Sequence, residues 1–214
     1  MYNVGFIPAR AGSKGIKSKN ITPINSKPLI WYTVSAAANS ELEKVYVSTD
    51  SEEIKATVEG FSFSKVEVIS RTGDSASDKA TSESALIEFA QNYKFNNVVF
   101  LQATSPLTTS EDINSGLKMF LKESYGAVIS AVKNHQFLWD CNGNPINYDP
   151  QNRPRRQDWD GYFIENGAFY ISSRENILKN NCRISNPVGY YEMNKKSLLE
   201  IDTAEDLELA KQLL

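Results

Sequence analysis

The sequence is poor in the residues that build disulfide frameworks and soft-metal sites. It contains two cysteines and one histidine among 214 residues. Cys141 and Cys182 are too few for a disulfide framework and do not form a C-x-x-C pair, so we expect reduced thiols in a cytoplasmic protein. Because His135 stands alone, a cluster of histidine ligands is excluded.

Long apolar runs and a strong net charge are missing as well. No segment approaches the run of about 18 apolar residues that crosses a membrane as a helix, and the segment after Met1 lacks the parts of a secretion signal. The formal net charge of -3 is opposite to the basic excess of general nucleic-acid binders. We therefore expect neither a membrane nor a nucleic acid as a partner.

What is present is typical of one globular α/β unit spanning residues 1–214, with 41% hydrophobic and 23% charged residues. Short apolar runs rich in branched residues alternate with amphipathic stretches. The strand-like runs are residues 4–7, 45–48, 66–69, 98–101 and 127–132, and the helix-like stretches are residues 29–38, 52–59, 83–93 and 111–122. This alternation predicts a mostly parallel sheet with helices on both faces.

Local signals mark the ends of these elements and a change of texture after residue 132. Asp50 with Glu53 and Thr109 with Asp112 have the spacing of capping boxes. A stretch rich in Pro, Asn and Gly over residues 142–154 indicates an excursion from the core. Strands at 167–171 and 197–201 and a helix at 204–213 then complete the predicted fold.

Ligands of open parallel sheets bind beyond the carboxyl ends of the strands, so the loop over residues 8–20 is a candidate site. Gly12 allows the backbone to approach phosphate oxygens, and Arg10, Lys14 and Lys19 supply positive charge. The loop has neither the Walker A order nor the dinucleotide fingerprint. On spacing alone, a phosphate-binding loop and a merely flexible, soluble loop both remain open.

Several motifs in sequence order resemble the CMP-sialic acid synthetase family. They are the loop at 8–20, the stretches 47–50, 78–82 and 101–106, the Arg-Pro-Arg-Arg-Gln-Asp-Trp-Asp-Gly string at 153–161, the Glu-Asn-Gly string at 165–167, and Phe169 with Tyr170. The resemblance covers nearly the whole chain. It implies a Rossmann-like nucleotidyltransferase domain and a homodimer, in which a dimerisation excursion at residues 135–166 reaches toward the partner's active site.

The resemblance also implies roles for individual residues. CTP would be held by Arg10, Gly12, Ser13, Lys14, Lys19, Asn20, Arg71 and Ser82, and the sugar acid by Gln102, Thr104, Ser105, Arg155, Arg156, Gln157 and Tyr170. Three of these interpretations have alternatives: Ser82 as a helix cap, Arg71 as a surface charge, and Arg155 with Arg156 as interface residues. Arg155 and Arg156 would otherwise grip the acid's carboxylate, directly or from the partner.

A carboxylate pair, Glu200 and Asp202, predicts a metal site. In an extended strand, residues i and i+2 point to the same side, so the two side chains converge while Ile201 points into the core. Carboxylates together with nucleotide phosphates are the usual ligands of Mg²⁺, with Mn²⁺ as an alternative ion. The resembled family has two aspartates here, so Glu200 is a departure. Alternatively, Asp202 only favours the dipole of a helix that Thr203 and Asp206 cap.

The predicted activity is transfer of CMP from CTP to a nine-carbon 2-keto sugar acid, with release of pyrophosphate. Arg10, Lys19 and Asp202 would carry the catalysis by positioning and charge neutralisation. The alternatives are a 3-deoxy-manno-octulosonate cytidylyltransferase and a non-catalytic nucleotide-binding module of the same fold.

The acid itself is open among the N-acetylneuraminate, deaminated neuraminate and legionaminate types. Bacterial relatives carry two phenylalanines where this chain has Arg183 and Ile184. A polar residue in place of an apolar cage favours a hydroxyl at carbon 5, and hence the deaminated acid.

Overall fold

The computed structural model describes residues 1–12, 15–71 and 81–214. Ser13, Lys14 and most of the predicted nucleoside loop at 78–82 lie outside these described residues. The central strand β1 (Asn3–Pro8) pairs in parallel with β4 (Lys44–Thr49) on one side and with β6 (Asn97–Leu101) on the other. Strand β5 (Val66–Ser70) adds to β4 in the same direction.

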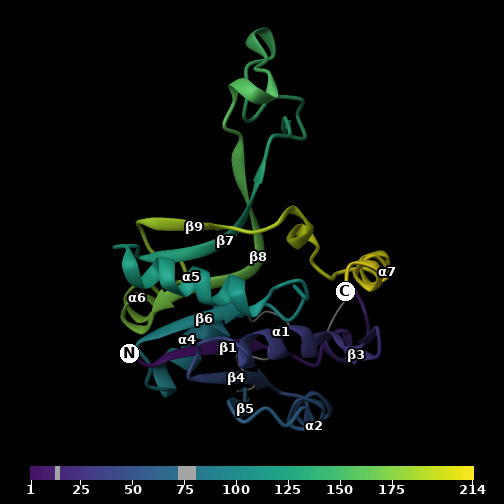
Figure 1. The fold of residues 1–214 in the computed structure, drawn as a ribbon, viewed down its shortest axis with the longest axis vertical. Helices are drawn as coiled ribbons and strands as arrows, with labels where there is room; N and C mark the ends of the chain where they lie inside the picture. The colour runs from purple at the N-terminus through teal and green to yellow at the C-terminus, as the bar shows by residue number, and fades with distance from the viewer. Residues whose placement is uncertain (13–14, 72–80) are drawn as a thin grey trace.

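The other half of the sheet contains the only reversed strand among the seven that the described residues contribute to this sheet; β2 (Pro23–Ile24) and β3 (Lys27–Pro28) pair separately. Strand β8 (Tyr162–Ser173) is antiparallel to both β6 and β7 (Ala127–Asn134), and β9 (Val188–Glu192) is parallel to β7. The strand order is β5-β4-β1-β6-β8-β7-β9, which confirms the predicted mostly parallel α/β fold (Figure 1).

Helices cover both faces of this sheet. The first core forms where α1 (Leu29–Ala38), α2 (Glu52–Glu59) and α5 (Ser110–Lys122) pack against one face of the sheet. The second core forms where α4 (Ser82–Asn92) and α6 (Arg174–Asn180) pack against the other face. Successive residues of a strand serve opposite cores: Phe6 belongs to the second and Ile7 to the first, as the twofold repeat of a strand requires. A third, smaller core lies under α7 (Ala204–Leu213).

Two local predictions are wrong. Ser51, rather than Asp50, caps α2, because its hydroxyl accepts from the Ile54 amide, and the carboxylate of Asp50 instead accepts from the Ala11 amide at 2.9 Å. Residues 197–201 form no strand: a 3-10 helix, η4 (Lys195–Leu198), ends there. The edge position of the sheet is taken by β9, which the prediction missed. The capping box of Thr109 with Asp112 is confirmed.

A narrow arm projects from the body between β7 and β8 (Figure 1). Beyond the register shared with β9, residues 132–134 of β7 pair only with β8, at residues 162–164, and form a two-stranded stem. The tip, residues 135–161, contains the short 3-10 helices η2 (Pro150–Asn152) and η3 (Arg156–Asp158). Stem and tip together span residues 132–164 and overlap the predicted excursion at 135–166, whose role in dimerisation stays a prediction.

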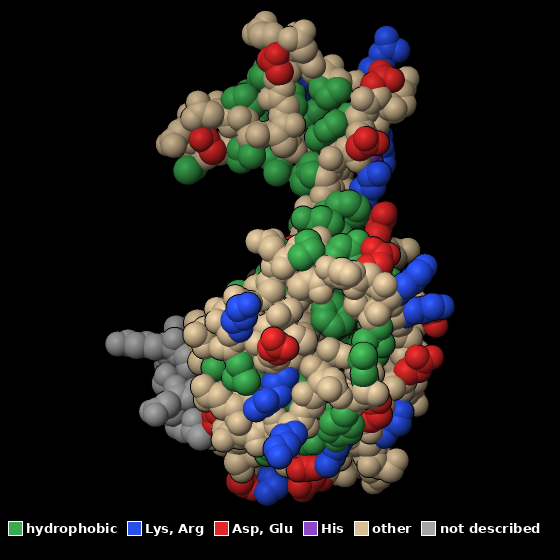
Figure 2. All heavy atoms as spheres, turned by 90° about the vertical axis from the view of Figure 1, so that its left-hand side faces the viewer, with side chains coloured by type: hydrophobic (Ala, Val, Ile, Leu, Met, Phe, Trp, Pro, Cys, Tyr) green, Lys and Arg blue, Asp and Glu red, His purple; other side chains and the backbone are tan. Residues whose placement is uncertain are grey.

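An aromatic cluster holds the tip together. Phe137 stacks on Trp159 with ring centroids 5.1 Å apart and lies 4.2 Å from Tyr148, and the guanidinium of Arg153 lies 4.4 Å above the Phe137 ring. In Figure 2, hydrophobic side chains gather on the side of the arm that is turned toward the body. Trp139, on the arm, is 51% exposed, so the described parts of the chain leave apolar surface of the arm uncovered.

Candidate active site

A cleft with a volume of about 470 Å³ opens beyond the carboxyl ends of β1 and β6. It brings together ten of the predicted site residues: Arg10, Gly12, Lys19, Asn20, Arg71, Ser82, Gln102, Thr104, Glu200 and Asp202. These residues come from segments up to 192 positions apart in the chain, between Arg10 and Asp202. The rule that ligands bind at the carboxyl ends of parallel strands therefore located the cleft correctly.

The loop after β1 is fixed at both ends. The Asp50 carboxylate holds the Ala11 amide, and the buried Asn20 donates from Nδ2 to the Arg10 carbonyl oxygen at 3.2 Å. Lys19 begins the 3-10 helix η1 (Lys19–Ile21), and its ammonium donates to the Ile201 carbonyl oxygen at 2.8 Å and to the Asp202 carboxylate at 2.9 Å. The loop is thus tied to the segment that carries the predicted metal ligands.

Glu200 and Asp202 both face the cleft. The Glu200 carboxylate accepts from the Thr104 hydroxyl at 3.0 Å, and the Ile201 amide donates to the Thr104 carbonyl oxygen at 2.8 Å. Ile201 itself is fully buried. The predicted alternation is present: Glu200 and Asp202 face the cleft and Ile201 faces the core. A backbone hydrogen bond between Ile201 and Thr104 holds the segment in this orientation, and no strand is formed.

The helix cap predicted as an alternative is also present. Thr203 and Asp206 form a capping box at the start of α7, and Asp206 accepts the Asp202 amide as well. Hydrogen bonds from the Asp202 and Thr203 amides lower the pKa of the Asp206 carboxyl. Capping thus occupies Asp206 and leaves the Asp202 carboxylate to the cleft.

The described residues hold no group of three or more His, Cys, Asp or Glu that would form a metal cage. A magnesium site made of two carboxylates and substrate phosphates needs no such cage, because Mg²⁺ is often bound by one or two protein carboxylates and keeps its remaining positions for waters and phosphates. Glu200 and Asp202 on one wall of the cleft fit that arrangement.

The predicted acid-binding residue Gln102 is held by a backbone contact. Its side-chain nitrogen donates to the Gly167 carbonyl oxygen at 2.8 Å. Gly167 has φ +69°, and a Cβ at this position would lie 2.6 Å from the Gln102 nitrogen. Neighbouring Asn166 is buried and donates to Ser197, at 2.9 Å to its hydroxyl oxygen. The Glu-Asn-Gly string is therefore a support for Gln102 as well as a sequence signature.

On the opposite side, Arg71 and the start of α4 line the cleft. Burial lowers the pKa of the Arg71 guanidinium, an effect opposed by the Asp50 carboxylate and reinforced by Arg10. Its Nε atom is buried and has no hydrogen-bond partner in the described parts of the chain, so Arg71 is no ordinary surface charge. Thr81, which the prediction missed, caps α4 and also lines the cleft. Ser82 is therefore not the cap.

Tyr170 and Ser105 lie behind the cleft wall rather than on it. Tyr170 is buried, and its hydroxyl donates to the Glu165 carboxylate; burial, followed by this bond, raises the pKa of the phenol. The Ser105 hydroxyl is buried without a partner among the described atoms. Neither residue is among those that line the cleft.

Arg183 also lies behind this wall and is already paired. Its guanidinium sits 4.6 Å above the Phe100 ring and 4.7 Å above the Tyr170 ring, and it forms an ion pair with Glu83 in the first turn of α4. Its backbone amide donates to the same carboxylate. Arg183, which the sequence suggested for contact with carbon 5 of the acid, thus joins α4 to the sheet. A contact between Arg183 and the acid stays a prediction.

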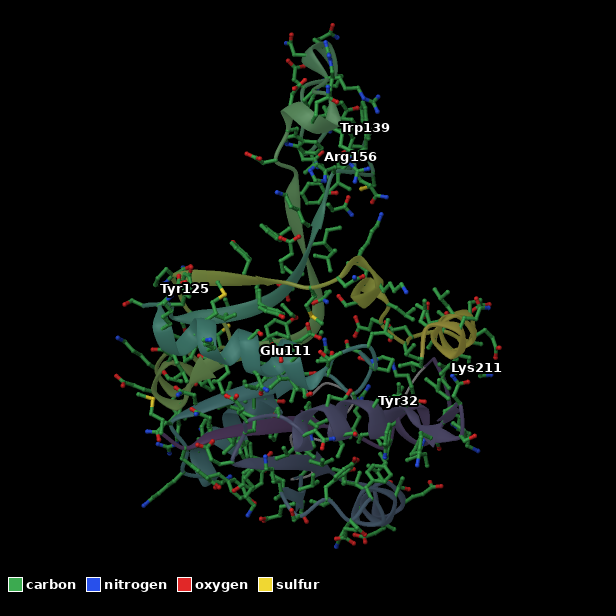
Figure 3. The ribbon with its side chains drawn as sticks, viewed as in Figure 1. Tyr32, Glu111, Tyr125, Trp139, Arg156 and Lys211 are labelled. Carbon is green, nitrogen blue, oxygen red and sulfur yellow. The ribbon has the colours of Figure 1, made fainter. Side chains whose placement is uncertain are left out.

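Arg155, Arg156 and Gln157 lie on the arm and are exposed. Figure 3 shows Arg156 and Trp139 both on the arm, away from the body. Arg155 is 3.9 Å from Asp158 in its own 3-10 turn. Within one chain, these three residues are not brought together with the cleft, and neither is His135, whose ring lies against Trp159.

None of the helices in the described residues is both long and apolar enough to pass through a membrane.

Comparison with known proteins places this geometry in a family. N-acylneuraminate cytidylyltransferase A of Danio rerio is 34% identical over 97% of this chain and 49% of its own length. The N-acylneuraminate cytidylyltransferase of Streptococcus agalactiae serotype V is 32% identical over 96% of this chain and 52% of its own length. The chain thus spans about half the length of the curated relatives that it matches.

Solved structures share the fold at low sequence identity. A CMP:2-keto-3-deoxy-manno-octonic acid synthetase complexed with CTP superposes with a TM-score of 0.76 at 18% identity, covering 100% of this chain and 98% of its own. A 4-diphosphocytidyl-2C-methyl-D-erythritol synthase from Anaerococcus prevotii gives 0.74 at 12% identity, covering 99% and 95%. The cytidylyltransferase family profile matches residues 4–214, from the first strand through the last helix, so this chain belongs to the cytidylyltransferase family.

Proposed function

We propose that the protein transfers CMP from CTP to a nine-carbon 2-keto sugar acid and releases pyrophosphate. The observation that carries the proposal is the cleft itself: a cationic loop, a carboxylate pair and a supported glutamine line one cavity in a chain of the cytidylyltransferase family. Relatives at 32% to 34% identity are named N-acylneuraminate cytidylyltransferases, which favours an acid of the sialic type.

The two substrates would occupy opposite parts of the cleft. Arg71 and Ser82 lie on the side where the cytidine would bind. The triphosphate would extend from there toward the Glu200 and Asp202 carboxylates, and Arg10 and Lys19 would neutralise its charge. Gln102 and Thr104, which follow β6, would face the acid. The buried Nε of Arg71, which has no partner among the described residues, supports this arrangement, because such a donor is stabilised when a ligand supplies an acceptor.

In the reaction, the oxygen of the acid's anomeric hydroxyl forms a bond to the α-phosphorus of CTP. The bond from that phosphorus to the oxygen that bridges it to the β-phosphorus breaks, pyrophosphate leaves, and the hydroxyl proton is released. Arg10 and Lys19 would stabilise charge on the leaving phosphates, and Gln102 would orient the acid. Mg²⁺ held by Asp202 and Glu200, or Mn²⁺ in its place, would supply Lewis acidity at the phosphate oxygens.

One assay separates this function from its alternatives. The protein is incubated with CTP, Mg²⁺ and, in turn, N-acetylneuraminate, its deaminated analogue, a legionaminate and 3-deoxy-manno-octulosonate, and pyrophosphate release is measured. Turnover with a nine-carbon acid supports the proposal, and preference for the eight-carbon acid contradicts it. Binding of CTP without turnover on any acid would indicate a nucleotide-binding module.

Among the nine-carbon acids, we propose that the deaminated acid is used at least as well as N-acetylneuraminate. Arg183 and Glu83 replace an apolar surface by a paired charge close to Tyr170, and such surroundings favour a hydroxyl over an acetamido methyl. The ratio of kcat/KM for the two acids decides: a preference of about a hundredfold for N-acetylneuraminate, equal to about 2.7 kcal/mol, contradicts this choice.

We also propose a homodimer in which the arm of one protomer reaches the other. The support is the exposed apolar surface at Leu138, Trp139 and Ile146 on an arm that contacts little of its own body (Figure 2). Sedimentation equilibrium of the wild type against a Trp139→Asp variant tests it: a dimer that becomes monomeric in the variant is expected, and a monomeric wild type contradicts it.

A further inference from the structure

Lys19 occupies an unusual position for a residue expected to bind phosphate. Its ammonium is not directed at open solvent: the side chain is only 15% exposed and donates to both Ile201 and Asp202. The Asp202 side chain is 67% exposed, so the carboxylate is accessible but carries a cation on one of its oxygens.

Backbone packing reinforces this contact. A Cβ on Gly15 would lie 2.5 Å from the Asp202 carbonyl oxygen, so the loop runs directly against the segment that carries the carboxylate. Together, Gly15 and Lys19 join the loop after β1 to residues 201–202 from two points. A divalent ion that approached Asp202 would meet a carboxylate whose charge is already partly balanced, and it would compete with the ammonium for that charge.

We propose that Lys19 is a gate on the metal site: it keeps Asp202 from binding a divalent cation until a nucleoside triphosphate draws its ammonium away. The inference rests on the proposed function, since it takes the triphosphate and the metal to share this cleft. The phosphate oxygens offer Lys19 a stronger partner than one exposed carboxylate does, and the flexible lysine stem lets the ammonium move while the backbone of η1 stays in place. The metal site would then be complete only in the presence of nucleotide.

The test measures metal binding without nucleotide and without turnover. Mn²⁺ is titrated into the protein, and free Mn²⁺ is followed by electron paramagnetic resonance. Lys19→Gln is expected to bind Mn²⁺ at least about tenfold more tightly than the wild type, because removing the gate leaves the carboxylate unpaired. The double variant Lys19→Gln/Asp202→Asn is expected to lose that gain, which assigns the new affinity to Asp202.

Lys17→Gln is the matched control, because it removes the same charge from an exposed position two residues earlier in the loop that does not line the cleft. A general electrostatic effect would strengthen Mn²⁺ binding equally in both variants and would overturn the proposal. Unchanged or weaker binding in Lys19→Gln would overturn it as well.

A second measurement on the wild type keeps the proposal testable if Lys19→Gln does not fold. The rate at which an amine reagent labels Lys19, relative to Lys17, is followed by mass spectrometry at rising Mn²⁺ concentration. Displacement from Asp202 should raise labelling of Lys19 alone, and an unchanged ratio at saturating Mn²⁺ contradicts the gate. Neither readout uses a sugar acid, so the gate and the proposed transfer reaction can fail independently of each other.

Discussion

The cleft and the arm are held together by different means. Cleft residues follow buried parallel strands, and backbone hydrogen bonds fix several of them, as with Gln102 on Gly167. The arm beyond its short stem depends on stacked rings and on turns in which exposed aspartates accept backbone amides. One chain therefore brings the described cleft residues together by itself, whereas the arm leaves charges and apolar rings exposed.

The largest effect should come from the carboxylate at the centre of the cleft. We expect Asp202→Asn to lower CTP-dependent turnover by about a hundredfold or more, a loss of about 2.7 kcal/mol in transition-state stabilisation, while the melting temperature stays close to that of the wild type. Glu200→Gln should be milder, because the amide oxygen still accepts from Thr104.

Asp206→Asn is the matched control for this prediction, since Asp206 caps α7. It should cost about 1 kcal/mol of stability and leave turnover nearly intact. If Asp202→Asn lowered only the melting temperature, its role would be structural and the cleft would lose its metal ligand.

The cations of the arm offer the next test, in comparison with those of the cleft. Arg10→Ala should lower kcat/KM at least about tenfold, because a lost charge-assisted contact costs about 1.5 to 3 kcal/mol. The double variant Arg155→Ala/Arg156→Ala should lower kcat/KM for the acid by a similar factor and leave kcat/KM for CTP unchanged, if the arm of one protomer serves the cleft of the other.

Mixing variants distinguishes the two arrangements of the arm. Asp202→Asn has an intact arm, and Arg155→Ala/Arg156→Ala has an intact cleft. Random exchange of protomers should restore about a quarter of the wild-type sites if the arm acts across a twofold dimer, because half of the dimers are mixed and each of these has one complete site. Activity that does not exceed the sum of the separate variants would place the arginines in their own chain's site or outside any site.

The sequence predicted the cleft better than the arm for a physical reason. Parallel strands bring their carboxyl ends to one edge, so the order of motifs after the strands was enough to gather Arg10 and Gln102, while the hydrogen bond from the Ile201 amide to Thr104 brings Asp202 to the same edge. The tip of the arm obeys no such periodicity. Its cluster of Phe137, Trp159 and Arg153 depends on contacts across a turn-rich stretch, and no period in the sequence indicates them.

The errors inside the body have the same origin. Residues 197–201 are apolar enough for a strand, but β9 already occupies the edge of the sheet beside β7. The segment is instead held by one backbone hydrogen bond, from the Ile201 amide to the Thr104 carbonyl oxygen. Arg183 and Tyr170 have carboxylate partners, Glu83 and Glu165, that no pattern in the sequence indicates, and their contact with the acid stays a prediction. Propensity along the chain does not show which partners the fold supplies.

Two of the glycines with positive φ, Gly167 in the body and Gly143 in the arm, allow the two regions to be compared directly. Gly167 has φ +69° and Gly143, in the arm, has φ +83°, so alanine is strained at both. Only at Gly167 would the new Cβ meet a neighbour, the Gln102 nitrogen. We expect Gly167→Ala to raise KM for the acid several-fold with KM for CTP unchanged, and Gly143→Ala to leave both within about twofold of the wild type. Equal effects of the two substitutions would show that backbone strain, and not the position of Gln102, is responsible.

The smallest effect concerns acid, and it should be seen in the arm alone. Side-chain bonds from Asn144 to Asp140 and from Asn152 to Asp149, followed by backbone amides, lower the pKa of both carboxyls below the usual 3.8. A carboxyl with a lowered pKa in the folded state stabilises its turn above the unfolded pKa, and this contribution is lost as the pH falls through the folded value. We therefore expect the arm turns to loosen below about pH 4.

A Trp31→Phe protein reports this loosening, because only Trp139 and Trp159, both in the arm, then remain. Their fluorescence should change on acidification before far-ultraviolet circular dichroism reports loss of the sheet, since the body is held by buried apolar side chains that do not titrate. Asp140→Asn/Asp149→Asn in the same background should show the loosened signal already at neutral pH and a weaker change with acid. Coincident fluorescence and dichroism transitions would mean that arm and body unfold as one unit, and the contrast between the two regions would then hold for their chemistry but not for their stability.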